Sequence, residues 1–387
     1  MPIIRFLSSV CLFILVSTPS FANSIIELTD HTISYERGSL DADTLNGDAK
    51  NVVIKQKSRR GGTILIDQYS LSSSKDGMTT TIENLSLTGL TFITPEQDKI
   101  TVEEFSWSDG QIEGNWMDFL IESSDGQNPM FSNLGVITAN SIIGAEQGRT
   151  VFIVDSIFID SSDMPNNPYQ NLPISDLSFE FRNIFIPAGS NDDEYAQSMR
   201  AMGLDGVRFS VALAGKNVLL EDRINTNVTL FLSADKMMDL RMSMGIGTSD
   251  LMLSELDRMV AVSNMDDVAD MYFELMMIGM FFNNMDIIIS DKGILDVMID
   301  EYAAEMGLNR SQAVSMMMDS VAASIGVAAP NTYREIAPHL RGFLNEGGTL
   351  YTGLNPPQPV PAASLLGIMA IPDQIKDLLG LSMSHQP

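Results

Sequence analysis

Short runs of alternating apolar and polar residues recur from Ser24 to about Gly247, and they restrict the fold more than any other feature of the chain. "TTIENLSLTGLTF" and "VRFSVALAG" are two of these runs. A period of two is typical of strands that bury one face. We therefore expect antiparallel β-structure over residues 23–247, with tight turns at Asp76-Gly77 and Asp109-Gly110.

Three segments that begin at Ile82, Val102 and Ile174 share the pattern apolar-x-x-apolar-Ser-apolar. We interpret this echo as repeated use of one strand-and-turn arrangement in a long antiparallel sheet. Its spacing is too irregular for a solenoid repeat.

The periodicity becomes helical near Ser249. Helices are predicted over 249–262, 265–283, 290–307, 311–325, 330–347 and 373–381, and a strand returns at 349–354. Gly307 suits a helix C-cap, and Thr332 and Glu335 have the spacing of a capping box.

Strands followed by helices indicate an α+β fold. The predicted architecture is a long curved antiparallel β-sheet followed by a C-terminal layer of helices packed on one face. The regions are 1–22, 23–247 and 248–387, and we expect the last two to form one compact unit or to pack closely.

The first 22 residues have the pattern of a cleavable signal peptide. Arg5 provides the positive charge, an apolar run follows, and Ser20-Phe21-Ala22 gives the cleavage site. Cleavage would remove Cys11, the only cysteine, so no disulfide is expected. These features predict a periplasmic or secreted protein of a Gram-negative bacterium, with no transmembrane span in the mature chain.

The chain is strongly acidic, with 23 Lys and Arg against 50 Asp and Glu, a net charge of −27. Without Arg5 the balance is 22 − 50 = −28. A field of this sign repels nucleic acid and anionic surfaces, so no nucleic-acid partner is expected.

Catalytic motifs are weak. Ser72-x-x-Lys75 matches three letters of a penicillin-binding-type motif without its companions, and the three histidines lie far apart. Residues 41–48 faintly resemble a calcium loop, but Leu45 and Asn46 occupy ligand and glycine places, which favours a turn. We therefore predict no enzyme activity, no metal and no cofactor.

Methionine is concentrated: 17 of the 26 lie between Met237 and Met318, in the predicted helical layer and its approach. Thioethers bind Cu(I), but no cysteine or nearby histidine accompanies them. Flexible apolar packing is the favoured interpretation.

"MYFELMMIGMFF" at 271–282 is the most apolar part of this region. The acids Asp267, Asp270 and Glu274 form one narrow stripe on the predicted helix, which excludes a membrane span. A helix with so little polar surface must be covered by protein or by a hydrophobic ligand. The candidate ligand-binding residues are Met271, Leu275, Met276, Ile278, Met280, Phe281 and Phe282.

The stretches "DIIISDKGILDVMIDEYAAEMGLNRSQA" (286–313) and "FLNEGGTLYTGLNPPQPVP" (343–361) resemble the late part of uncharacterised β-rich exported proteins of alphaproteobacteria. The overall character is distantly similar to the AsmA-like group of envelope proteins. That resemblance covers the last third of the chain and implies a link to lipid traffic, without a transferable site residue.

The leading hypothesis is a non-enzymatic periplasmic protein that binds or carries a lipid-like ligand on the concave side of its sheet. The alternative is an envelope scaffold that contacts proteins and has no small-molecule ligand. A hydrolase with an unrecognised site is a third reading.

Overall fold

The structure is a computed structural model that divides into two compact units. Unit 1 comprises residues 1–163 and 177–208, and unit 2 comprises residues 164–176 and 209–387. The residues that the structure describes are 24–28, 31–57, 62–77, 79–94, 97–113, 131–161, 176–189, 199, 202–220, 223–260, 275–277, 279–369 and 371–387. The division at residue 208 places the last strands of the predicted β-region in the same unit as the helices.

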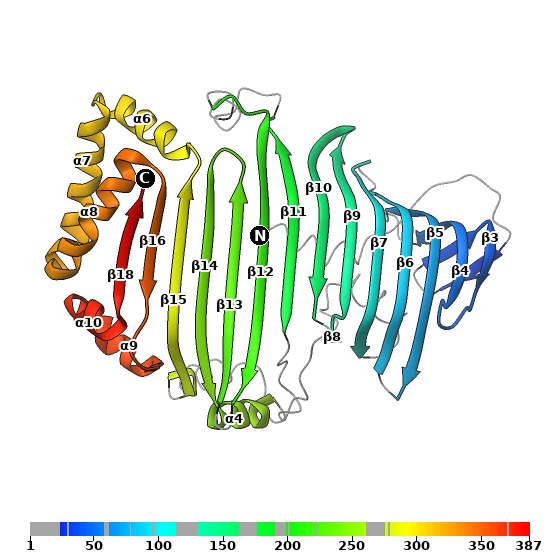
Figure 1. Cartoon of the computed structure of the whole chain (residues 1–387). Coiled ribbons are helices and arrows are strands. Elements are labelled where there is room, and N and C mark those ends of the chain that lie inside the picture. Colours follow the sequence, from blue (N-terminus) through cyan, green and yellow to red (C-terminus); the bar gives the residue numbers. More distant parts are fainter. Residues whose placement is uncertain are drawn as a thin grey trace. The chain divides into compact units, whose positions relative to one another are not determined.

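Unit 1 is an antiparallel sheet. Its strands are β1 (Ser24–Glu27), β2 (His31–Tyr35), β3 (Arg37–Leu40), β4 (Gly47–Gln56), β5 (Thr63–Asp76), β6 (Thr79–Ile93), β7 (Lys99–Glu113), β8 (Phe131–Asn133), β9 (Val136–Glu146), β10 (Arg149–Asp160) and β11 (Leu177–Pro187). Pairing runs in the order β1-β2-β4-β5-β6-β7-β9-β10-β11, with β3 beside β4 and β8 beside β7 (Figure 1).

One row of residues crosses this sheet from β4 to β11, and we call it the crease. The registers of neighbouring strands align Asn51, Asp67, Gly89, Glu103, Ser141, Asp155 and Asn183. The members on β4, β6, β9 and β11 have left-handed φ angles between 50° and 61°. The members on the intervening strands β5, β7 and β10 are all acidic.

On each strand that it crosses, the crease interrupts the alternation of buried and exposed side chains and moves the buried positions along by one residue. Buried side chains therefore stand three apart across it, as in the pairs Ala49 and Val52, Ile66 and Tyr69, Val102 and Phe105, Ala139 and Ile142, and Val154 and Ile157. This spacing explains the apolar-x-x-apolar pattern of the segment that begins at Val102. The echo at Ile82 and Leu85 crosses a second irregularity, where the β5–β6 register shifts.

Two turn predictions for unit 1 have different outcomes. The turn at Asp76-Gly77 is confirmed, because β5 ends at Asp76 and Gly77 has a φ of 60°. The turn at Asp109-Gly110 is wrong, because both residues lie inside β7. Asp109 has a left-handed φ of 56° and so carries a turn-like conformation without ending the strand.

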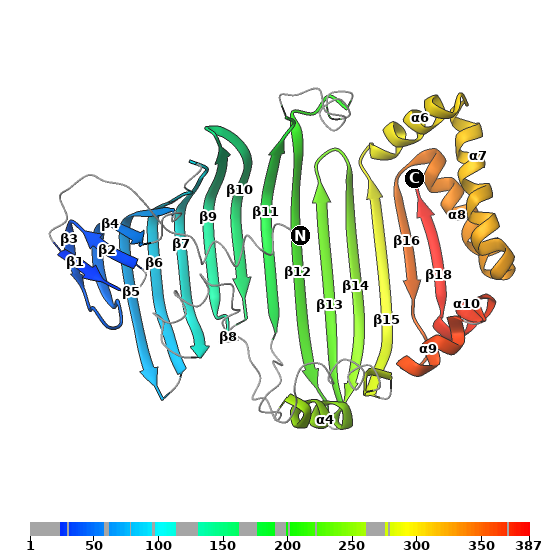
Figure 2. The same cartoon turned by 180° about the vertical axis from the view of Figure 1, so that it is seen from behind.

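Unit 2 combines antiparallel strands with the helices. Its strands are β12 (Gly206–Leu219, in this unit from Phe209), β13 (Arg223–Ala234), β14 (Met238–Ser249), β15 (Met280–Asp291), β16 (Thr349–Leu354), β17 (Val360–Pro361) and β18 (Leu381–Gln386). Pairing follows β12-β13-β14-β15-β16-β18, and β17 pairs with the start of β15. Figure 2 shows β13 to β16 side by side from behind.

The helices of unit 2 are α4 (Asp250–Val260), α6 (Ile294–Met306), α7 (Arg310–Val321), α8 (Pro330–Glu346), α9 (Ala362–Met369) and α10 (Ile375–Leu379). A π-turn at Ala322–Gly326 continues α7, and a 3₁₀ turn at Pro372–Gln374 precedes α10. Ile299, Ala303, Ala313, Val314 and Met318 form a small core between α6 and α7.

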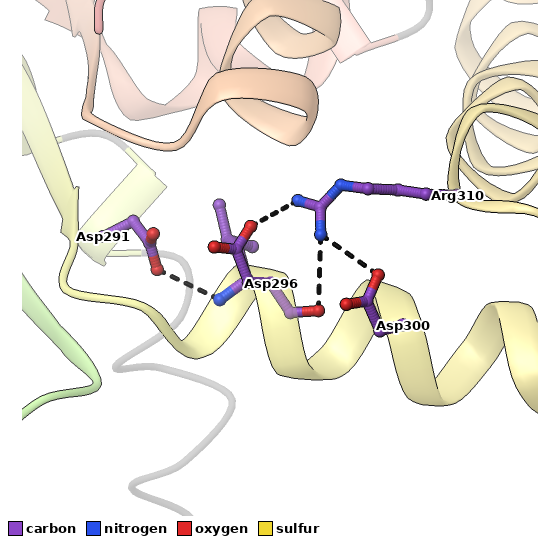
Figure 3. Close-up of polar contacts among 5 residues, drawn as sticks. Asp291, Asp296, Asp300 and Arg310 are labelled. Atoms are coloured by element: carbon purple, nitrogen blue, oxygen red, sulfur yellow. Dashed lines mark hydrogen bonds and ion pairs between the residues drawn. The ribbon is translucent and has the colours of Figure 1, made fainter.

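Polar contacts fix the start of α6 and its angle to α7. Asp291 Oδ1 accepts a hydrogen bond from the backbone N–H of Leu295 at 3.0 Å, close to the start of α6 (Figure 3). Arg310, at the start of α7, contacts Asp296 at 2.5 Å and Asp300 at 3.2 Å. The two aspartates are four residues apart and therefore share one face of α6, where one guanidinium reaches both.

Helix α8 packs against the last strand of the sheet. The ring of Phe343 lies edge-on to His385 with centroids 6.2 Å apart, and His385 Nε2 is 2.8 Å from the carbonyl oxygen of Gly347. Gly342 lies so close that a Cβ there would approach His385 Nδ1 to 2.6 Å. A glycine inside α8 thus permits the close approach of helix and strand.

The α+β class and several helix limits are confirmed. Gly307 caps α6 in a left-handed conformation, α8 ends before Gly347, and the returning strand occupies Thr349–Leu354 as predicted. The capping box at Thr332 is wrong: the N-cap of α8 is Ala329, without a side-chain cap bond, and Asp373 instead accepts bonds from the N–H groups of Asn331 and Thr332. A capping box does occur at α7, between Asn309 and Gln312.

Candidate functional site

The sheet of unit 2 has two chemically different faces. Residues that alternate along β12 to β15 fall into cross-strand rows, because the register is continuous over most of these strands. One set of rows is aliphatic and contains methionine, and we call it the apolar face. The opposite set carries serine, threonine, asparagine and charged residues, and we call it the polar face.

The apolar face contains no hydrogen-bonding side chain in its three central rows on β12 to β15. The rows are Val211–Leu232–Leu240–Ile289, Leu213–Leu230–Met242–Ile287 and Gly215–Val228–Met244–Met285. Every one of these residues is half-buried. A large aliphatic surface that retains partial exposure in every row is suited to contact with a further apolar molecule.

Unit 1 shows how the same chain buries a comparable set of side chains. There Ile82 and Ile112 have no measurable exposure, and Trp107 is 1% exposed. The indole N–H of Trp107 also donates to the carbonyl oxygen of Leu134 at 2.7 Å. The three central rows of the apolar face are therefore less completely buried than these core residues of unit 1.

The predicted ligand-binding residues are divided among several places. Met271 and Ile278 lie outside the described residues. Leu275 and Met276 are helical and half-buried, whereas Met280, Phe281 and Phe282 are not helical, because they begin β15. Phe282 pairs with Ile246 on the apolar face, and Phe281 pairs with Gly247 on the polar face. The helix predicted over 265–283 is therefore wrong at its end.

The methionines do not belong only to helices. Met238, Met242, Met244, Met280 and Met285 occupy β14 and β15. Met242, Met244 and Met285 lie in the central rows of the apolar face. Sequence reasoning missed this face because Asn283 is an extra residue opposite Gly245 and Ile246, and it breaks the alternation of β15. The remaining signal was the run Ile287-Ile288-Ile289.

The polar face contains an open depression of about 410 Å³. Arg241, Ser243, Asp286, Ile288, Tyr351 and Gly353 are among the residues that line it. Its lining side chains come from β14, β15, β16 and β18. Gly353 is its least bulky member: a Cβ there would meet Asp286 Oδ1 and Ser382 Oγ at 3.0 Å.

The motifs weighed for catalysis have structural roles. Ser72 donates a hydrogen bond to Glu83 at 2.6 Å, and together with Ser74 it lowers the pKa of the Glu83 carboxyl. The turn at residues 41–48 is confirmed, because Asp41 Oδ1 accepts from the N–H and hydroxyl of Thr44, each at 2.8 Å. Within the described ranges, no group of three or more His, Cys, Asp or Glu could hold a metal ion.

The comparisons with known proteins concern mainly unit 2. A family model described as "Uncharacterized protein" matches residues 231–386, which begin in β13 and end in β18. The curated proteins give no match. In the part of the chain that the structure describes, no helix has the length and apolarity that crossing a membrane requires.

Proposed function

We propose that this chain is an exported protein of the cell envelope that binds the hydrocarbon part of a lipid on the apolar face of unit 2, without catalysing a reaction. The supporting observation is the three half-buried rows of Val, Leu, Ile and Met across β12 to β15. In this proposal the C-terminal helices border the same face, and the protein resides in the periplasm of a Gram-negative bacterium.

The chemistry of the rows suits an acyl chain. Burial of hydrocarbon on an aliphatic surface is favourable by roughly 25 cal/mol per Å². Four strands at about 4.8 Å spacing give a surface about 14 Å wide between the outer strands. Met242, Met244 and Met285 add flexible side chains that adapt to a chain of variable shape.

Charge limits the class of lipid. The net charge of −27 disfavours an anionic head group, so the proposal is a lipid whose head group is neutral, zwitterionic or cationic. The resemblance to AsmA-like envelope proteins, which are associated with lipid traffic, also supports a lipid as the ligand.

Extraction of the natively purified protein tests the proposal directly. Organic solvent should release a lipid that mass spectrometry identifies, and the emptied protein should bind a fluorescent monoacylglycerol. Leu230→Glu, on the apolar face, should abolish binding of this probe, whereas Thr229→Glu, its neighbour on the polar face, should retain it.

Two results would argue against lipid binding. One is an empty extract combined with no probe binding by the wild type, which would favour the envelope scaffold. The other is equal probe binding by both variants, with thermal melts showing that both are folded.

A further inference from the structure

The polar face of unit 2 has features that the lipid proposal does not use. Phe231, Arg241, Ile288 and Tyr351 form one cross-strand row on this face. The next row consists of Thr229, Ser243, Asp286 and Gly353. Aromatic rings thus stand beside hydroxyl, carboxylate and guanidinium groups. We infer that this face binds an uncharged saccharide in the depression around Tyr351.

The side chains match the two kinds of surface that a sugar presents. Tyr351 lines the depression and is half-buried, so its ring can cover the C–H face of a pyranose. Arg241 offers several donors in a fixed plane, and Asp286 offers acceptors. Neighbouring sugar hydroxyls can accept hydrogen bonds from the guanidinium of Arg241 and donate hydrogen bonds to the carboxylate of Asp286.

Arg241 is available for a ligand. It is exposed, and no ion pair or hydrogen bond joins its guanidinium to another group in the described part of the chain. Asp286 has one neutral partner, because Asn355 Nδ2 donates to Asp286 Oδ1 at 3.2 Å. The carboxylate of Asp286 can therefore accept further hydrogen bonds from a ligand.

Gly353 is the glycine that lines the depression. It is buried and has no positive φ, so no left-handed conformation requires glycine there. Glycine inside a strand weakens it and often marks the close approach of a ligand or of another part of the chain. A Cβ at this position would meet Asn355 Nδ2 at 2.9 Å and both Asp286 Oδ1 and Ser382 Oγ at 3.0 Å, so glycine leaves room for these polar groups at the depression.

The charges indicate an uncharged ligand. Asp286 and the net charge of −27 repel an anion, and Arg241 repels a cation in the same depression. The volume of about 410 Å³ lies within the range of small-molecule sites. This site does not depend on lipid binding, because it lies on the opposite face of the same strands.

Calorimetric titration of the full chain with neutral disaccharides (maltose, cellobiose and chitobiose) tests the inference. At least one should bind, and Asp286→Asn and Arg241→Gln should each weaken binding by about tenfold, the effect of losing a good hydrogen bond. Lys216→Ala, an exposed residue on the same face outside the depression, should change affinity less than about twofold.

A measurement on the wild type keeps the test independent of how the variants fold. The methyl resonances of Ile288 should shift on addition of the bound disaccharide, while those of Ile289, on the apolar face and outside the lining of the depression, should not. Absence of binding by all three disaccharides, an unchanged Ile288 signal, or full affinity in Asp286→Asn and Arg241→Gln would overturn the inference.

Discussion

Replacing Gly89 by alanine should destabilise unit 1 by more than its backbone conformation alone explains. Gly89 has a φ of 61°, which costs a residue with a Cβ about 1–2 kcal/mol. A Cβ there would also stand 2.1 Å from Asp67 Oδ2 and 2.9 Å from Asp67 Cβ. Overpacking of this kind adds roughly 1–3 kcal/mol, giving a loss of about 2–5 kcal/mol in total.

Gly77 provides the matched control. Its φ of 60° is nearly the same, but nothing lies within 4 Å of the position that its Cβ would take. Gly77→Ala should therefore show only the backbone cost of about 1–2 kcal/mol. Asp67→Ala removes the carboxylate, so in that background the cost of Gly89→Ala should fall toward that of Gly77→Ala.

Urea denaturation followed by tryptophan fluorescence is the appropriate assay. Both tryptophans, Trp107 and Trp116, belong to unit 1, so their signal reports the unfolding of this unit. Equal losses for Gly89→Ala and Gly77→Ala would refute the role assigned to Asp67. A cost of Gly89→Ala that is unchanged in the Asp67→Ala background would refute it as well.

Three further predictions concern other positions. Ser141→Asn should raise the stability of unit 1 by about 0.5 kcal/mol in the same urea assay, because Ser141 has a φ of 53° and asparagine tolerates that region better. Glu83→Gln should lower the melting temperature at pH 7, because a carboxyl with a lowered pKa stabilises the fold only while it is ionised. The difference from wild type should be full above the ordinary glutamate value of 4.5 and should shrink as the pH falls from 4.5 toward the lowered pKa of the folded protein. A difference in melting temperature that does not shrink at all on acidification below 4.5 would contradict this. Gly342→Ala should destabilise the wild type, because its Cβ would contact His385. In a His385→Ala background the same change should stabilise α8 by about 1 kcal/mol, the usual gain of alanine over glycine in a helix. Thermal melts of the wild type, the two single variants and the double variant would show whether the sign of the effect reverses.

The sequence predicts elements well where one period holds and a stop signal is local. Alternation identified the strands of unit 1, and Gly307 and Gly347 marked the ends of α6 and α8. The strand β18 was missed, because its six residues follow a short helix directly. Asp373 was missed as the partner of Asn331 because the two lie 42 residues apart.

The candidate site was harder to predict for a related reason. The segment 271–282 was assigned to one helix because its apolar residues are nearly continuous, and continuous runs do not distinguish a helix from a strand. Register decides which side chains share a face, and register depends on distant partners. Met242 and Ile287 are direct neighbours in the sheet, yet nothing in either segment alone indicates it.

The crease also restricts how a chain of this kind can change its length during evolution. Left-handed and acidic positions alternate from strand to strand, from Asn51 on β4 to Asn183 on β11. Insertion of a single strand would place two positions of the same kind next to each other, whereas insertion of a hairpin would preserve the alternation. We therefore expect relatives of unit 1 to differ by even numbers of strands, with each added pair bringing one left-handed residue and one carboxylate.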